Sequence, residues 1–143
     1  MNETMVKFGY PDTLIKEFDH WVILLRLQQA TLGALVVICK DQATTFSMIS
    51  AEAFTELKNV SKTLESGLKK CFSYNKINYL MLMMVDPDVH FHVLPRYAGT
   101  KLFEDMEFYD AGWPGLPDLS YVNEIDLRIK QGLMDTLQQS LSS

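Results

Sequence analysis

Two pairs of apolar runs, separated by one segment with helical periodicity, constrain the fold of this chain more than any other feature. The runs WVILLRL and LGALVVICK, between residues 21 and 40, are rich in Val, Ile and Leu and predict an antiparallel pair of strands. The runs INYLMLMMV and DVHFHVLPRY, between residues 77 and 97, predict a second pair. We expect the turn between them at Asp86 and Pro87, because proline fixes its own backbone angle and lacks a donor.

The segment between the two strand pairs changes to steps of three and four residues, and Ser50 is its expected N-cap. This spacing predicts an amphipathic helix, whose apolar face consists of Phe54, Leu57, Val60, Leu64, Leu68, Cys71 and Phe72. Strand pairs separated by a helix predict an α+β fold with helices packed on an antiparallel sheet.

The C-terminal third of the chain is expected to contain a loop followed by a second helix. Residues 98–118 include AGWPGLPD and predict one long irregular segment. From Ser120 onward the helical spacing returns, at Val122, Ile125, Ile129, Leu133 and Leu137. We therefore predict a single domain over residues 1–143, with its core in residues 18–97 and a C-terminal loop and helix in residues 98–143.

Length and charge limit the partners and the location that we expect. A chain of 143 residues has the usual size of one domain, and its net charge of −5 argues against binding a nucleic-acid polymer through its phosphates. The N-terminus lacks the pattern of a secretory signal, and the longest apolar runs are too short to span a bilayer, so we expect no membrane association and a cytoplasmic location. Cys39 and Cys71 lie in apolar runs and are expected to be reduced thiols.

The stretch DVHFHV places polar and apolar residues at alternate positions of an expected strand. Because side chains alternate across a strand, Asp88, His90 and His92 are predicted to share one face, while the apolar residues between them point to the other. This face has three possible interpretations: an ordinary solvent face, a metal site that would need further ligands from elsewhere, or a site for a phosphate. Histidine is the only side chain whose ordinary pKa lies near neutrality, which favours chemistry over a solvent face.

The stretch HFHVLPR follows an expected hairpin, TLGALVV lies on an earlier expected strand, and a helix is expected between them. In these features the sequence resembles the histidine triad (HIT) family of nucleotide hydrolases and transferases. The longer run KINYLMLMMVDPDVHFHVLPRY is similar to a bacterial-type subgroup of the family. The resemblance implies an α+β domain whose antiparallel sheet continues across a homodimer, and it implies no obligatory metal or cofactor.

Carried over by position, the family's middle histidine falls on His90, the nucleophile that attacks the α-phosphorus of a nucleotide. The third falls on His92, a phosphate ligand that would stabilise developing charge if it is protonated. The first falls on Asp88, which departs from the family pattern. Asp88 could retune the histidines or give a proton to the leaving group, or it could be a turn residue at the strand entry.

Further positions either depart from the family pattern or could bind the substrate. Ala34 follows Gly33 where many members of the family have histidine. Arg26 occupies the place of the Asn or Asp that commonly binds the ribose hydroxyls. Arg96 could give a fork of donors to phosphate oxygens, or could be a solvated or dimer-facing arginine. Asn78 could meet a ribose or phosphate, or could cap its strand.

The resemblance implies a hydrolase or nucleotidyl transferase that acts on a small-molecule nucleotide through a nucleotidyl-histidine intermediate. The expected substrates are dinucleoside polyphosphates or nucleoside phosphoramidates. The alternative is a nucleotide-binding protein of this kind with weak catalysis or none.

Overall fold

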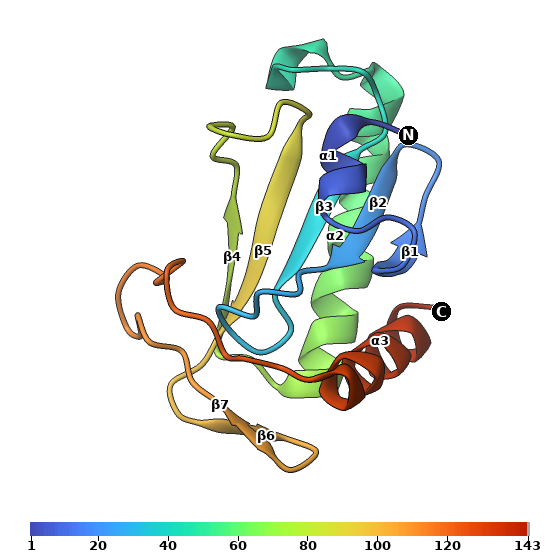
Figure 1. Ribbon diagram of the computed structural model, residues 1–143. Helices are drawn as coiled ribbons and strands as arrows, with labels where there is room; N and C mark the ends of the chain where they lie inside the picture. Colours follow the sequence, from blue (N-terminus) through green and yellow to red (C-terminus); the bar gives the residue numbers. More distant parts are fainter. Residues whose placement is uncertain (143) are drawn as a thin grey trace.

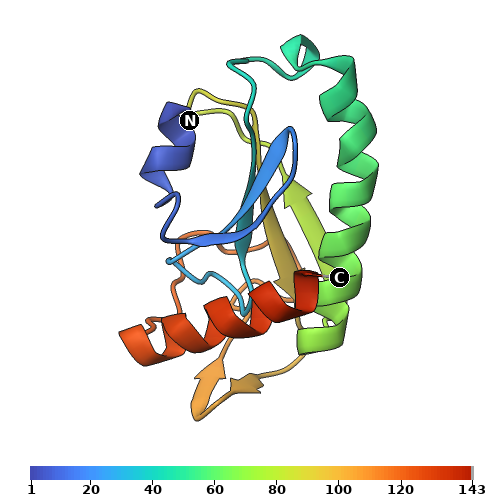
Figure 2. The same cartoon turned by 90° about the vertical axis from the view of Figure 1, so that its right-hand side faces the viewer.

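A five-stranded antiparallel sheet forms the centre of the computed structural model, which describes residues 1–142 (Figure 1). Its strands stand in the order β1-β2-β3-β5-β4 and span Leu14–Glu17 (β1), Trp21–Leu25 (β2), Leu35–Cys39 (β3), Lys76–Leu80 (β4) and His90–Arg96 (β5). A short helix α1 (Glu3–Lys7) and the long helix α2 (Ala51–Phe72) lie on opposite faces of this sheet (Figure 2). The predicted α+β fold is therefore confirmed.

The predicted helix after Ser50 is confirmed as α2. The Ser50 hydroxyl accepts a hydrogen bond from the backbone N–H of Ala53 at 3.1 Å, which satisfies one of the free donors of the first turn. Val60, Leu64 and Leu68 form its buried face against the sheet. The indole N–H of the fully buried Trp21 donates to the carbonyl of Ala53, so β2 and the start of α2 are also tied by a polar contact.

The second predicted strand pair is confirmed, but β4 is shorter than expected. It ends at Leu80, and residues 81–89 form an irregular connection in which Met83 adopts a left-handed backbone with φ 53°. This connection brings Asp86 and Asp88 beside the N-terminal segment. A tight hairpin would instead have kept both residues at the end of the strands.

The C-terminal region differs from the prediction in two respects. The segment expected to be irregular contains the hairpin β6 (Lys101–Phe103) and β7 (Met106–Phe108), which lies at the lower end of the molecule in Figure 1. The last helix, α3 (Leu127–Leu141), starts later than Ser120, because the Asp126 carboxylate caps it by accepting from the N–H of Ile129 at 2.8 Å.

One hydrophobic core joins these parts. Apolar side chains of α2, of α3 and of the facing side of the sheet form a single cluster, so α3 is packed into the domain. The sheet also extends outside residues 18–97, the predicted core of the domain, because β1 lies before residue 18. Neither β1 nor α1 was predicted. No helix within residues 1–142 is long and apolar enough to cross a membrane.

Candidate functional site

The two histidines of β5 lie on the face of the sheet that α1 covers. In the strand register His90 lies beside Ile38 and His92 beside Val36. Both β3 residues belong to the apolar cluster that packs against α1, whereas Val93 and Phe91 pack with the core on the α2 side. The predicted alternation is therefore confirmed for His90 and His92, whereas Asp88 lies in the connection before β5. The solvent-face interpretation is wrong, because His90 is 2% exposed and His92 is 8% exposed.

The imidazole of His90 has a defined hydrogen bond on one nitrogen. Its Nδ1 lies 2.7 Å from the backbone carbonyl of Asp88, and because a carbonyl only accepts, Nδ1 carries the proton in this contact. A neutral His90 then has its free electron pair on Nε2. This is the arrangement that a nucleophilic imidazole requires.

His92 lies beside His90 and is neutral at pH 7. The two rings meet edge to face with their centroids 5.2 Å apart. Burial lowers the pKa of His92 from 6.5 to about 4, and the positive charge of Arg26 acts in the same direction. Its Nδ1 is buried and has no hydrogen-bond partner among residues 1–142. In the free protein at pH 7 His92 therefore lacks the proton that its expected role in stabilising developing charge requires.

The residue that covers both histidines is Phe8, directly after α1. Its ring centroid lies 6.2 Å from that of His90 and 5.9 Å from that of His92. The segment that carries Phe8 is fixed to the sheet, because the side-chain amide of Asn2 donates to the carbonyl of Cys39 at 2.8 Å. The histidines are thus buried by the N-terminal segment of the chain.

Asp88 holds this N-terminal segment in place. One of its carboxylate oxygens accepts hydrogen bonds from the backbone N–H of Thr4 at 3.0 Å and from the Thr4 hydroxyl at 2.9 Å. The backbone N–H of Asp88 lies 3.1 Å from the same hydroxyl. Its side chain is not among those that line the pocket beside His92. This geometry favours the structural alternative for Asp88 over the predicted catalytic one.

The role of Asp88 can be tested by removing its carboxylate. We expect Asp88→Ala to lower the free energy of unfolding by about 2 kcal/mol, since hydrogen bonds to a buried charged group are lost. Hydrogen exchange should accelerate in residues 3–8, and Thr4→Val should cause a similar change. The double variant should lose little more than either single variant, because both act on one contact. Unchanged exchange in residues 3–8 would contradict this role.

An open pocket of about 470 Å³ lies next to His92, on the α1 side of the sheet. It is formed by the end of α1 and the residues directly after it, the segment after β2 and the irregular connection before β5. Its walls consist of Lys7, Phe8, Gly9, Arg26, Leu27, Gln28, Val85, Asp86 and His92. This volume is typical of pockets that bind small molecules. The structure therefore brings together the predicted site residues His92 and Arg26.

The charged side chains at the pocket differ in their availability to a ligand. Lys7 is bound to Asp86 at 2.5 Å at the pocket wall, so these charges largely neutralise each other. Arg26 has no such partner, and its Nε is buried without a hydrogen bond among the described residues. The side-chain amide of Gln29 donates to the carbonyls of Arg26 and Ala34, which braces the segment after β2.

Arg96 and Asn78 do not lie at this pocket, and their predicted role in substrate binding is corrected. Arg96 is 3% exposed and forms a bidentate pair with Asp110, with Nε to oxygen at 2.7 Å and Nη2 to oxygen at 3.0 Å. Its Nη1 donates to the side-chain oxygen of Asn78 at 2.8 Å. All three nitrogens of the guanidinium are engaged, so Arg96 fixes the loop after β7 to the end of β5.

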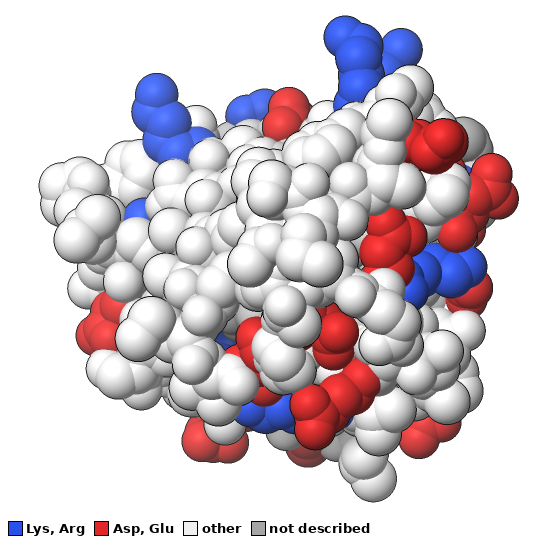
Figure 3. Space-filling view, turned by 90° about the horizontal axis from the view of Figure 1, so that it is seen from above, with Lys and Arg blue, Asp and Glu red and all other residues white. Residues whose placement is uncertain are grey.

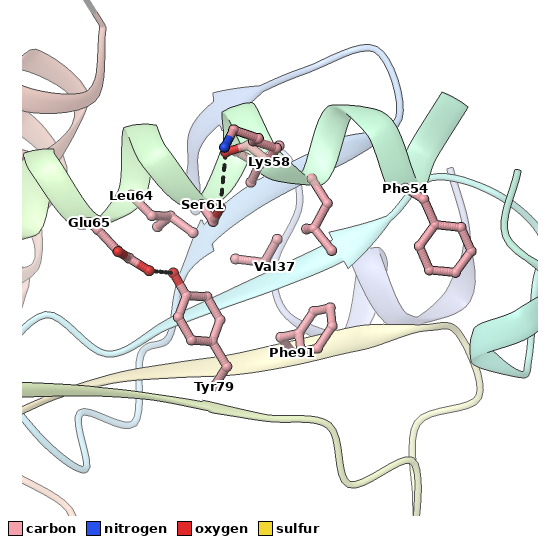
Figure 4. Close-up of a pocket in the computed structure, with 10 residues that line it drawn as sticks. Val37, Phe54, Lys58, Ser61, Leu64, Glu65, Tyr79 and Phe91 are labelled. Carbon is pink, nitrogen blue, oxygen red and sulfur yellow. Dashed lines mark hydrogen bonds between the residues drawn. The ribbon is translucent and has the colours of Figure 1, made fainter. Parts of the chain in front are cut away.

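The other surfaces carry different chemistry. An apolar pocket of about 380 Å³ lies on the opposite face of the sheet, where Phe54 and Leu64 of α2 face Tyr79 and Phe91 of the sheet (Figure 4). On the face shown in Figure 3, Lys and Arg are scattered among Asp and Glu around an uncharged area, without a continuous basic surface. In residues 1–142, no group of three or more His, Cys, Asp or Glu side chains is placed to hold a metal ion.

The contributors that sequence reasoning missed come mainly from the N-terminal segment and the connection before β5. Lys7 and Phe8 belong to a segment for which no helix was predicted. Asp86 was assigned only to a turn. No periodic pattern in the sequence marks Lys7, Phe8 or Asp86 as pocket residues. Only the position of Asp86, a few residues before the histidines in the sequence, could have indicated that it belongs to the site.

Comparison with known proteins identifies similar sequences and folds. A family model described as HIT domain matches residues 7–99. A histidine triad protein from Sinorhizobium meliloti superposes with a TM-score of 0.76 at 16% identity, covering 98% of this chain and 95% of that one. A histidine triad protein from Bradyrhizobium japonicum gives 0.75 at 14% identity, with 99% and 96% covered.

A hypothetical histidine triad nucleotide-binding protein from Sulfolobus tokodaii gives a TM-score of 0.71 at 17% identity, covering 97% of this chain and 89% of that one. At these identities the solved structures show a shared fold. A search of curated proteins gives no match.

Proposed function

Because the chain belongs to the HIT domain family, whose members are generally nucleotide hydrolases or transferases, we propose that it attacks the α-phosphorus of a nucleotide with His90. The observation that carries this proposal is the bond from His90 Nδ1 to the Asp88 carbonyl, which leaves the Nε2 electron pair free. The pocket beside His92 gives the nucleotide a place to bind. The proposed substrates are dinucleoside polyphosphates or nucleoside phosphoramidates.

The proposed reaction has two displacements at phosphorus. In the first, His90 Nε2 forms a bond to the α-phosphorus while the bond to the leaving group breaks, and the leaving group departs with the electron pair. In the second, water or another acceptor attacks the nucleotidyl-histidine and His90 is released. Covalent catalysis of this kind replaces one difficult step by two easier ones.

Each neighbour of His90 has a part in this scheme. The Asp88 carbonyl keeps the proton on Nδ1 and so holds the reactive tautomer. His92 faces the pocket and would donate a hydrogen bond to a non-bridging oxygen. A bound phosphate would also raise the pKa of His92 from its low value, because a nearby anion favours the charged imidazole. Phe8 would have to shift for phosphorus to reach Nε2, since it covers both rings.

The proposal is tested by incubating the purified protein with diadenosine polyphosphates and with adenosine 5′-phosphoramidate. We expect release of AMP from at least one of these substrates, measured by chromatography. No AMP from any member of the panel, at protein concentrations that exceed those of the substrate, would contradict the proposed reaction.

A nucleotide-binding protein without catalysis is the second candidate, and one observation favours it. His90 is buried under Phe8, and the carboxylate that replaces the family's first histidine holds the covering segment in place. This candidate predicts that AMP raises the melting temperature while the same panel shows no turnover.

We also propose that two copies of the chain pair through β4. This strand is at the edge of the sheet, and its outer side has no partner strand within residues 1–142. The apolar pocket between α2 and β4 adjoins that edge, and a second copy would cover it (Figure 4). Sedimentation equilibrium should then give about twice the chain mass of 16.4 kDa.

A further inference from the structure

Arg26 is a charged side chain whose hydrogen-bonding capacity is not used by the described part of the protein. It is partly buried, and the loss of hydration lowers its pKa, while the charge of Asp86 acts in the opposite direction. Its Nε is buried without a partner. A buried charged donor without an acceptor is costly, so such a group in an open pocket indicates a site for an acceptor from a ligand.

The pocket offers Arg26 no free carboxylate. Asp86 is bound to Lys7 at 2.5 Å, and His92 contributes a second buried nitrogen without a partner in residues 1–142. The polar side chains that remain available at the pocket wall are thus the guanidinium of Arg26, the imidazole of His92 and the amide of Gln28. Arginine matches the oxygens of a phosphate with two parallel donors, so this combination favours an anionic ligand.

The strand register separates this site from the position of His90. Leu24 lies beside Val36, and Val36 lies beside His92, while Arg26 is two residues beyond Leu24. Along the strand direction, the backbone of Arg26 is therefore two residues beyond the level of His92 and four residues beyond the level of His90. Two residues of a strand span about 7 Å. The Phe8 ring lies between them, 6.0 Å from Arg26 Cζ and 5.9 Å from the His92 ring.

The register thus places the backbone of Arg26 on the side of His92 that faces away from His90, and an anion bound by Arg26 on that side would be a second group beside the phosphorus that His90 attacks. The pocket wall also includes Phe8, Leu27 and Val85, and these apolar side chains are suited to a nucleoside. The leaving group departs from the phosphorus on the side opposite His90. A nucleoside that stays bound to His90 would then have the pocket available to it.

We infer that Arg26 determines specificity by binding a second phosphate, carried by the nucleoside portion of the substrate. The preferred substrate would thus be a nucleotide that carries a 2′- or 3′-phosphate in addition to the 5′-phosphorus that reacts. This inference rests on the proposed function. It gives Arg26 an anionic ligand, a phosphate, in place of the neutral ribose hydroxyls that the family commonly binds at this position.

Binding measurements with matched ligands test the inference. Isothermal titration would compare AMP, adenosine 2′,5′-bisphosphate, adenosine 3′,5′-bisphosphate and inorganic pyrophosphate. We expect the wild-type protein to bind one bisphosphate about tenfold or more tightly than AMP, as one charge-assisted contact allows. Arg26→Gln should remove this preference and leave AMP affinity nearly unchanged, while Arg26→Lys should keep part of it. Arg128→Gln, at an exposed arginine of α3 bound to Asp105, is the matched control and should behave as wild type.

The outcomes separate this inference from the proposed function. Equal affinity for AMP and both bisphosphates, in a protein that turns over nucleotides, would contradict only the role of Arg26. An equal loss of AMP and bisphosphate binding in Arg26→Gln would also contradict it, because Arg26 would then hold the single phosphate. If no nucleotide binds while pyrophosphate binding still depends on Arg26, an anion site is supported and the proposed function is wrong.

Discussion

Replacing His90 by alanine should reduce nucleotide turnover by at least about a thousandfold, because the group that forms the bond to phosphorus is removed. The imidazole of His90 is held by the Asp88 carbonyl at 2.7 Å, whereas the neighbouring imidazole of His92 has no partner on Nδ1 within residues 1–142 to fix its tautomer. Turnover would be measured with the substrate that the panel identifies, at saturating concentration, so that loss of binding is not mistaken for loss of chemistry.

Two controls make the His90 result interpretable. His20→Ala changes a histidine near Asp41, outside the pocket, and should keep wild-type turnover. Because His90 is buried, His90→Ala could also unfold the protein, so His90→Gln should be measured beside it, and the melting temperature of each should be recorded. A folded His90→Ala or His90→Gln variant with wild-type turnover would contradict the assignment of the nucleophile.

Acidification should destabilise the protein through His92. Its pKa is about 4 in the folded chain and near 6.5 when burial is lost, so between these values the unfolded chain binds more protons than the folded one. The free energy of unfolding therefore falls as the pH decreases from 7 toward 4. The contribution of His92 to this fall is about 3 kcal/mol, from 1.36 kcal/mol for each unit of pKa.

Urea unfolding at pH 7 and at pH 4, followed by tryptophan fluorescence, measures this effect. His92→Gln should lose less stability between the two pH values than the wild type, by roughly the same 3 kcal/mol. His20→Gln is the matched control for replacing a histidine and should retain the wild-type difference. An identical pH dependence in wild type and His92→Gln would show that His92 is not held neutral by the fold.

The parts of the fold that could be predicted from sequence are those with a local pattern. Alternation in β5 placed His90 and His92 on one face, and three- and four-residue spacing located α2 with its Ser50 cap. These patterns depend only on the period of the strand or helix and on one capping side chain, so a single sequence is sufficient.

The features that could not be predicted depend on contacts between distant residues. Helix α1 has five residues, too few for a periodic signal, and it is held by a contact between Thr4 and Asp88, 84 positions apart. Alternation correctly places Arg96 on the strand but cannot show that Asp110 reaches it from a later loop. Because Asp110 binds it, Arg96 is a buried structural group and not the expected phosphate ligand. Because α1 packs on the sheet, the face with the histidines is covered and not open to solvent.

The central claim is that His90 forms a covalent bond to the substrate, and trapping the intermediate tests it most directly. The protein would be mixed with the substrate, denatured within milliseconds at alkaline pH, digested and examined by mass spectrometry. We predict a peptide that carries one nucleotidyl group on His90 and that is absent from His90→Ala. A nucleotidyl group on another residue, or full turnover with no modified peptide during the first turnover, would contradict the claim.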